Sequence, residues 1–246
     1  RGGSMGGYEF LNIPDSCFIG NTIYKKLFYE NADLSASDKS LFTSVINKIS
    51  WLYCLKPETI NIAAYRDEVR DYPEIEGIEV LVHKDYKLRR IAEIIMRTIP
   101  YPMLLIFKLE DKRQLYLAHQ RISQSDSNKN TIEEFIVTDW LDGNSDLFKR
   151  LDIKQMRFTN FFALYSDIVD TVSIYNLSTM MPADDNITGL EARKLAREIE
   201  DIEEEMIDLR HKLKKESQFN RKMELNIKIK GLEQRKNNLL GGDING

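Results

Sequence analysis

The chain has 246 residues, 42% of them hydrophobic, which is enough to bury a core in one domain that carries an appendage. A formal net charge of −4 argues against a nucleic-acid binder that is basic overall, although it says nothing of local basic patches. The two cysteines, Cys17 and Cys54, are too few for a disulfide framework. We expect Cys54 to be a buried free thiol on an apolar helical face. We expect no structural zinc site, because neither cysteine has metal-ligand neighbours.

The sequence carries no membrane signal. No apolar run approaches the length of a membrane span, and no signal-peptide pattern opens the chain. We therefore expect a soluble, cytoplasmic protein without a membrane partner. Residues 1–7, RGGSMGG, look like a cloning scar and are left out of the fold prediction.

The first elements of the core are predicted to be one helix and two strands. Residues 38–53 repeat apolar side chains at steps of three and four, which predicts an amphipathic helix that ends before Pro57. Residues 59–64 alternate apolar and polar side chains as a strand does. After a charged connector, Gly77 opens a second strand that runs to Val82.

The most apolar run, residues 99–107, predicts the central strand of the domain. Pro100 and Pro102 separate it from a helix predicted over residues 86–98, because proline fixes φ and lacks an N–H. The last five residues of the run show no polar alternation, which indicates a strand buried on both faces. Residues 114–119 return as the second strand of a hairpin.

A further strand over residues 134–138 and a long helical region over residues 145–172 complete the domain. Residues 8–177 are therefore predicted to be an α+β domain, with a mixed sheet of about five strands covered by helices. Residues 178–189, which hold Pro182 and two aspartates, predict a linker.

Residues 190–240 predict a second, highly charged helical unit, followed by a tail over residues 241–246. Apolar residues recur seven apart in two frames, and the pattern fails between them through residues 217–220. Residues 198–208 hold seven acids and no base, whereas residues 210–236 hold ten Lys or Arg and three Glu. These charges favour an antiparallel helical hairpin, but an antiparallel coiled-coil dimer satisfies the same pattern. The predicted seam consists of Leu195, Ile199, Ile202, Met206, Leu209, Leu213, Leu225, Ile229 and Leu232.

No pattern in the sequence indicates a chemical reaction. The three histidines have no accompanying serine or cysteine motif, and a Walker-type loop, a G-x-G-x-x-G turn and an H-E-x-x-H helix are absent. A restriction-type nuclease needs an acid and a lysine two apart on one strand. Here Glu79 and Lys84 are five apart, on opposite faces. We therefore predict no catalytic, cofactor-binding or metal-binding residue, and a divergent nuclease-like fold without an intact active site stays a minority alternative.

Basic side chains in the charged unit could contact phosphate. No aromatic stacking platform or base-reading motif accompanies them, so solubility and pairing within the chain are favoured over nucleic-acid binding. The candidate contacts are Lys212, Lys214, Lys215, Arg221, Lys222, Lys228 and Lys230.

Three blocks of sequence, taken together, resemble a known family. They are residues 41–62 (LFTSVINKISWLYCLKPETINI), residues 98–107 (TIPYPMLLIF) and residues 216–226 (ESQFNRKMELN). Over about residues 12–240 the chain resembles a bacterial domain of unknown function, family 4391. Members of that family have no assigned activity, so the resemblance supplies no catalytic residue. It implies an accessory role, because such domains are often encoded beside helicase and DNA-methyltransferase genes in restriction-like loci.

These observations lead to three hypotheses about function. The first is a non-catalytic adaptor without a cofactor, whose seam residues associate with a protein partner or a second copy, in a locus that encodes a helicase and a DNA methyltransferase. The second is a nucleic-acid-binding module that uses the basic half of the charged unit. The third is the divergent nuclease-like fold, for which Mg²⁺ or Mn²⁺ would bind near residues 67–79.

Overall fold

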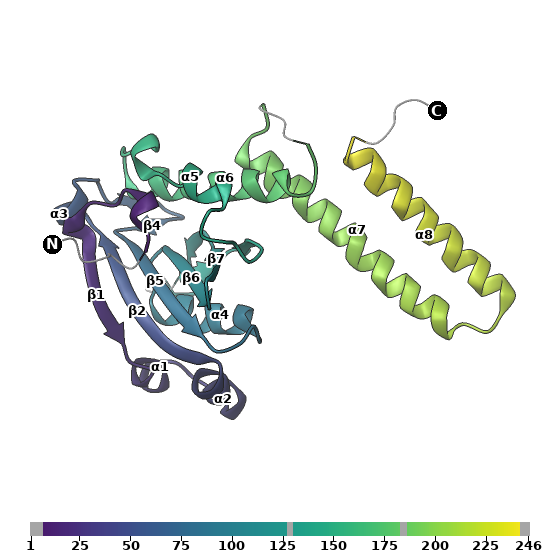
Figure 1. The fold of residues 1–246 in the computed structure, drawn as a ribbon, viewed down its shortest axis with the longest axis horizontal. Helices are drawn as coiled ribbons and strands as arrows, with labels where there is room; N and C mark the ends of the chain where they lie inside the picture. Colours follow the sequence, from purple (N-terminus) through teal and green to yellow (C-terminus); the bar gives the residue numbers. More distant parts are fainter. Residues whose placement is uncertain (1–6, 127–129, 183–185, 242–246) are drawn as a thin grey trace. The chain divides into compact units, whose positions relative to one another are not determined.

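The structure, a computed structural model, describes residues 7–126, 130–182 and 186–241 (Figure 1). It divides into two compact units, residues 1–172 and residues 173–246, which are taken separately below. Most of the predicted cloning scar, three residues of the predicted linker and most of the predicted tail lie outside the described residues.

The first unit is built on a six-stranded mixed sheet, which confirms an α+β fold with one strand more than expected. The strand order is β1-β2-β5-β6-β7-β10. Every neighbouring pair is antiparallel except β5 and β6, which are parallel and joined through helix α4, Leu88–Thr98. The strands are β1 Phe18–Ile23, β2 Ile46–Leu55, β5 Ile75–Val82, β6 Met103–Leu109, β7 Lys112–Leu117 and β10 Ile136–Val137.

Strand β6 is the central buried strand that its sequence predicts. Its first five residues, Met103 to Phe107, are all buried, because both faces of the sheet are covered at this point. Helix α4 ends at Thr98, just before the two prolines, and β7 returns beside β6 as an antiparallel hairpin. The segment around Pro100 and Pro102 therefore separates helix α4 from strand β6, as predicted.

Helices cover one face of the sheet, and the N-terminal segment and later helices cover the other (Figure 1). The first face packs against α1, α2 and α4 through a cluster that includes Phe28, Phe42 and Ile91. On the second face, Leu11, Leu104 and Leu151 line one apolar pocket. The helices are α1 Lys26–Asn31, α2 Ala36–Ser44, α3 Pro57–Ile60, α5 Asp146–Arg150 and α6 Phe161–Ser178. Two small ribbons pair β3 Tyr65–Arg66 with β4 Asp71–Tyr72, and β8 Gln120–Ile122 with β9 Asn130–Ile132.

Three predicted elements are wrong in the first unit. Residues 38–53 are not one helix, because α2 ends at Ser44 and β2 begins at Ile46. The predicted strand over residues 59–64 begins instead within the short helix α3 and holds no strand. The predicted helix over residues 145–172 is divided into α5, a 3-10 turn and α6. For residues 38–53, pairing with β5 decides the backbone against the helical spacing. The other two errors overlooked local signals, because α3 begins at Pro57 and the 3-10 turn after α5 is capped by Asp152.

The second unit contains the predicted helical hairpin. Helix α7, Gly189–Lys215, and helix α8, Phe219–Leu239, pack against one another and are joined by three residues (Figure 1). Thr188 caps α7, because its hydroxyl accepts from the Glu191 N–H at 3.1 Å while the Glu191 side chain accepts from the Thr188 N–H. The turn falls at residues 216–218, where the heptad pattern fails.

Within the described ranges, no helix is both long and apolar enough to cross a membrane.

Candidate functional site

The hairpin seam joins the two helices of a single chain. Ile199, Ile202, Met206, Leu209 and Ile229 are buried. The other four predicted seam residues, which are half-buried, are Leu195, Leu213, Leu225 and Leu232. Because these side chains pack within the hairpin, a partner would have to contact other parts of its surface.

Ion pairs between the helices match the predicted charge pattern. Arg235 is 2.8 Å from Glu198, Lys236 is 2.9 Å from Glu203, and Arg210 is 3.0 Å from Glu233. Each pair joins a residue of α7 to one of opposite charge on α8, and the three-residue connection between the packed helices makes the hairpin antiparallel. Such exposed pairs stabilise by only about 0–1 kcal/mol each, so they select the register more than they hold the arm together.

The end of the hairpin near its turn is strongly basic. Residues 210–230 hold eight Lys or Arg and two Glu, a net charge of +6. All seven of the predicted phosphate-contacting cations lie on this part and are exposed. Only Lys212, which is 3.0 Å from Asp208, has an ion-pair partner among the described residues. The positive charge is therefore largely uncompensated.

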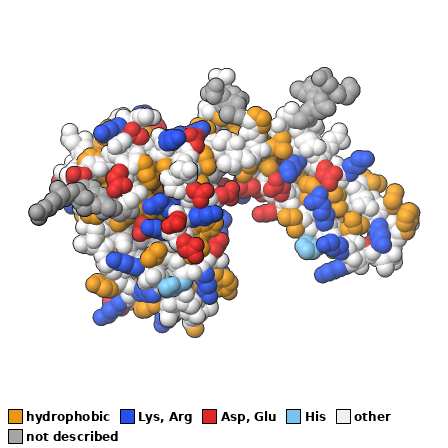
Figure 2. Space-filling model, in the orientation of Figure 1, with side chains coloured by type: hydrophobic (Ala, Val, Ile, Leu, Met, Phe, Trp, Pro, Cys, Tyr) orange, Lys and Arg blue, Asp and Glu red, His pale blue; other side chains and the backbone are white. Residues whose placement is uncertain are grey.

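An apolar stripe lies among these cations. Phe219, Met223 and Ile227 are 73%, 47% and 67% exposed, and their four-residue spacing places them on one side of α8. That side is turned away from Ile229 and the seam. Figure 2 shows hydrophobic and basic side chains intermingled on the hairpin. We call Phe219, Met223, Ile227 and the seven cations the tip surface.

Sequence reasoning missed the apolar part of the tip surface. The spacing of residues 219, 223 and 227 is visible in the sequence, but the heptad pattern assigned only Leu225 and Ile229 of this region to an apolar face. Phe219 also supplies an exposed aromatic ring beside basic residues, which the sequence was judged to lack.

The residues considered for a nuclease have separate partners. Glu79 accepts a hydrogen bond from the Tyr8 hydroxyl at 2.5 Å. Asp67 accepts from two backbone N–H groups of its own turn, each at 2.7 Å. The Lys84 ammonium lies 5.3 Å from the centre of the Tyr86 ring. These contacts give no support to a shared metal site of the nuclease type.

His119 belongs to a packed aromatic group. Its Nδ1 is 2.7 Å from the Tyr72 hydroxyl, and the two rings are stacked. The Tyr165 ring meets the histidine edge-on, and the Tyr165 hydroxyl donates to the Met103 carbonyl at 2.8 Å. These contacts give His119 a structural role at the end of the sheet.

A buried cluster of acidic groups lies where β2 and β5 pair. Cys54 is opposite Glu76 in the ladder, and Glu74 precedes β5. The Cys54 thiol donates to Glu74 Oε2 at 2.8 Å and lies 3.8 Å from Glu76 Oε1. Trp51 Nε1 donates to Glu76 Oε2 at 2.7 Å. Cys54 and Glu76 are only 3% and 2% exposed.

Burial is the main cause of the raised pKa values in this cluster. Desolvation, followed by a hydrogen bond with Glu74 and its negative charge, raises the pKa of Glu76 to about 8. Desolvation and the Glu74 hydrogen bond also raise the pKa of the Cys54 thiol. Within the described part of the chain, this is the one set of three such side chains whose ligand atoms lie within 4.8 Å of one another.

The cluster corrects two expectations. Cys54 lies on a strand rather than on a helical face, although it is a buried free thiol as predicted. It also has neighbours that could bind a metal, but they lie 20 and 22 residues further along the chain. Inspection of nearby sequence could not find them, because strand pairing brings them together. Cys17, by contrast, donates weakly to the Thr59 carbonyl at 3.8 Å.

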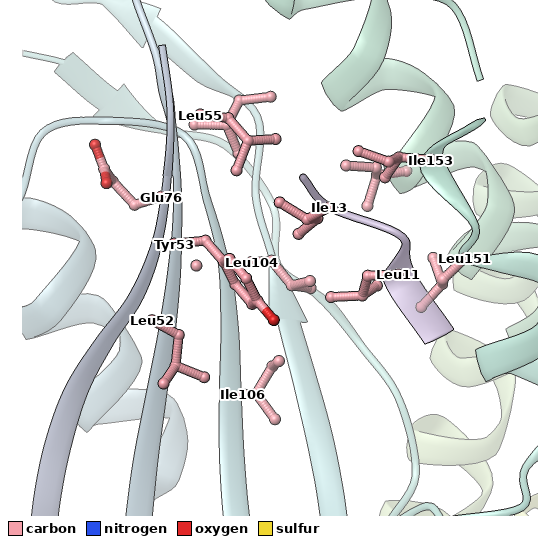
Figure 3. Close-up of a pocket in the computed structure, with 13 residues that line it drawn as sticks. Leu11, Ile13, Leu52, Tyr53, Leu55, Glu76, Leu104, Ile106, Leu151 and Ile153 are labelled. Carbon is pink, nitrogen blue, oxygen red and sulfur yellow. The ribbon is translucent and has the colours of Figure 1, made fainter. Parts of the chain in front are cut away.

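An apolar pocket lies on the second face of the sheet. It is lined by hydrocarbon side chains such as Leu11, Leu104 and Leu151, and Figure 3 shows the Glu76 carboxylate pointing away from them. With few polar groups converging on it, the pocket offers no group for a reaction and is read as part of the core.

Comparison with known proteins identifies the family of the chain. A family model described as "Domain of unknown function (DUF4391)" matches residues 11–235. Neither the curated proteins nor the solved structures gave a match to the chain. The matched segment covers most of the 246 residues. The chain therefore belongs to the DUF4391 family, in agreement with the resemblance found in its sequence.

Proposed function

We propose that this protein is a non-catalytic adaptor of the cytoplasm, which docks a partner protein on the tip surface of its hairpin. The observation that carries the proposal is the exposed stripe of Phe219, Met223 and Ile227 among uncompensated cations. The seam is already packed, so the stripe is a second apolar face that the hairpin itself leaves uncovered.

The stripe has the dimensions of a helix-recognition surface. Residues four apart along an α-helix are separated by about 6 Å, so three such side chains extend over about 12 Å. A row of apolar side chains on one side of a helix is the usual device by which a helix enters an apolar groove or pairs with another helix. Isolated apolar residues on a surface need no explanation, but a row of three does.

The surrounding charge selects the partner. Lys222, Lys228 and Lys230 border the stripe, and none forms an ion pair with a described residue. Like charges facing each other would disfavour a second copy of α8 on this surface, and an acidic partner would be attracted. We therefore infer an acidic protein segment with apolar side chains of its own.

The proposed setting follows from the family resemblance. Domains of this kind are often encoded beside helicase and DNA-methyltransferase genes, so the proposed partner is one of these enzymes in a restriction-modification or defence locus. The adaptor would contribute binding rather than chemistry.

The proposal is tested with two labelled helical peptides that share one leucine stripe. Glutamates flank the stripe in one peptide, and lysines flank it in the other. In fluorescence anisotropy at about 0.15 M ionic strength, the full chain should bind the acidic peptide and not the basic one. The triple variant Phe219→Ala, Met223→Ala, Ile227→Ala should weaken binding at least about tenfold, because a few apolar anchors carry most interface energy. Ile207→Ala removes an exposed apolar side chain of α7 and serves as the matched control.

A nucleic-acid partner is the second candidate, and exposed Phe219 beside Arg221 and Lys222 favours it. Aromatic stacking on bases and cation contacts with phosphates occur together in single-strand binders. Met223 and Ile227, however, have no counterpart on a phosphate backbone. Tight binding of labelled DNA at about 0.15 M ionic strength, retained when Met223 and Ile227 are both Ala, would establish nucleic acid as the partner and reject the adaptor.

A further inference from the structure

We propose that Cys54, Glu74 and Glu76 bind a divalent metal ion of the Zn²⁺ type. The ion would join strands β2 and β5 at the end of the sheet where β6 begins. This site is separate from the tip surface, so its failure would leave the proposed function intact.

The donor atoms are close to the separations that a metal site requires. Zinc lies about 2.3 Å from sulfur and 2.0–2.2 Å from oxygen, so donors of a tetrahedral site are about 3.3–3.8 Å apart. Cys54 Sγ and Glu76 Oε1 are already 3.8 Å apart. Cys54 Sγ and Glu74 Oε2 are 2.8 Å apart and would separate slightly around an ion. Glu74 is half-buried and precedes β5, so it has room to move.

The cluster lacks the cation that buried acids normally have. Glu76 is 2% exposed, yet among the described residues neither Glu74 nor Glu76 forms an ion pair. The cation whose charge acts on Cys54 is Lys56, which is itself exposed. Buried carboxylates in proteins are paired with a cation, protonated or bound to a metal. A divalent ion would compensate both carboxylates and a Cys54 thiolate at once.

A neighbouring side chain holds the site in position. Trp51 Nε1 donates to one oxygen of Glu76, which leaves the other oxygen directed at Cys54. Outer hydrogen bonds of this kind orient the ligands of known metal sites. Trp51 is a positioning residue in this proposal, because it contacts a ligand and not the ion.

The donor set selects the metal. A thiolate is a soft ligand that favours Zn²⁺ and related transition metals over Mg²⁺ and Ca²⁺, whereas carboxylates accept both classes. Three protein ligands satisfy all but one position of a tetrahedral ion, and water would complete it. The proposed ion is therefore of the Zn²⁺ type.

Cobalt tests the proposal, because Co²⁺ bound by a thiolate absorbs in the near ultraviolet. Titration of the metal-free full chain with Co²⁺ should produce this band at one equivalent, and Zn²⁺ should then abolish it. The band should persist in Cys17→Ser, which changes the other buried cysteine, and disappear in Cys54→Ser. Trp51→Phe should retain the band with affinity about 10–100-fold weaker.

If the three side chains instead form a hydrogen-bonded cluster that keeps its protons, the wild-type protein should bind no metal ion. If wild-type protein gives no band at one equivalent of Co²⁺ and Zn²⁺ does not raise its melting temperature, the metal site is refuted. These two measurements use the unaltered chain, so they decide the matter even if Cys54→Ser folds poorly. A band that survives Cys54→Ser and is lost in Cys17→Ser would also overturn the assignment.

Discussion

Truncation of one seam residue tests the packing of the hairpin in quantitative terms. Ile202 and Ile207 lie on the same helix, but Ile202 is 2% exposed and Ile207 is 55% exposed. Replacing isoleucine by alanine removes three carbons, which corresponds to about 2.4 kcal/mol at ~0.8 kcal/mol per buried CH₂ group. Both variants gain the same few tenths of a kcal/mol in helix propensity, so that contribution cancels in their comparison. We expect Ile202→Ala to destabilise the hairpin by about 2–3 kcal/mol and Ile207→Ala to have almost no effect.

Hydrogen exchange of the full chain, read by mass spectrometry, measures this effect where it occurs. A loss of 2.4 kcal/mol corresponds to roughly 50-fold faster exchange of the protected amides in α7 and α8, since 1.4 kcal/mol is tenfold. Amides of β5 and β6 should be unaffected in both variants and report the integrity of the first unit. Equal acceleration by the two substitutions, or none by Ile202→Ala, would refute the assignment of Ile202 to a packed seam.

Three further substitutions probe other features of the fold. Hydrogen bonds from Arg90 hold the pKa of Asp38 at about 2, below an ordinary value near 3.9, so the stability it contributes is lost as pH falls from about 4 to 2. Urea unfolding between pH 2 and 5 should show this loss in wild type but not in Asp38→Asn. Tyr165→Phe should cost about 1–3 kcal/mol in urea unfolding, because two buried backbone groups lose their partner, whereas exposed Tyr24→Phe should cost almost nothing. Gly231→Ala should stabilise α8 by about 1 kcal/mol in the exchange assay, since an added Cβ meets no atom within 4 Å.

Elements specified by local sequence were predicted well. The hairpin follows from heptads within each helix and from charge that changes from acidic to basic after residue 208, and both signals lie within 50 residues of chain. Strand β6 was equally clear, because Pro100 and Pro102 set its beginning and an unbroken apolar run indicated burial on both faces.

Elements decided by distant contacts were not predicted. Val45, Ile46, Ile49 and Leu52 satisfy helical spacing, yet β2 pairs with β1 and β5 on its two sides and is buried along much of its length. Side-chain spacing cannot distinguish a buried helix from a central strand when both faces are apolar. Pairing with β5, whose residues lie 20 to 36 positions further along the chain, decides the outcome.

The candidate sites also differ in whether the local sequence reveals them. The basic cations of the tip surface were identified from the sequence because charge is read directly from composition. The Cys54 cluster could not be identified, since Glu74 and Glu76 reach the thiol only when β5 pairs with β2. The exposure of Phe219 could be established only from the structure, because an aromatic residue next to the turn could equally have packed between the two helices.

The affinity of the acidic helical peptide for wild-type protein and for the Phe219→Ala, Met223→Ala, Ile227→Ala variant tests the adaptor proposal most directly. All three side chains are exposed, so the variant should fold as wild type does, and circular dichroism verifies this. The account predicts binding to wild type at about 0.15 M ionic strength and at least about tenfold weaker binding to the variant. Equal affinity for the two proteins would contradict it, because the apolar stripe would then take no part in docking.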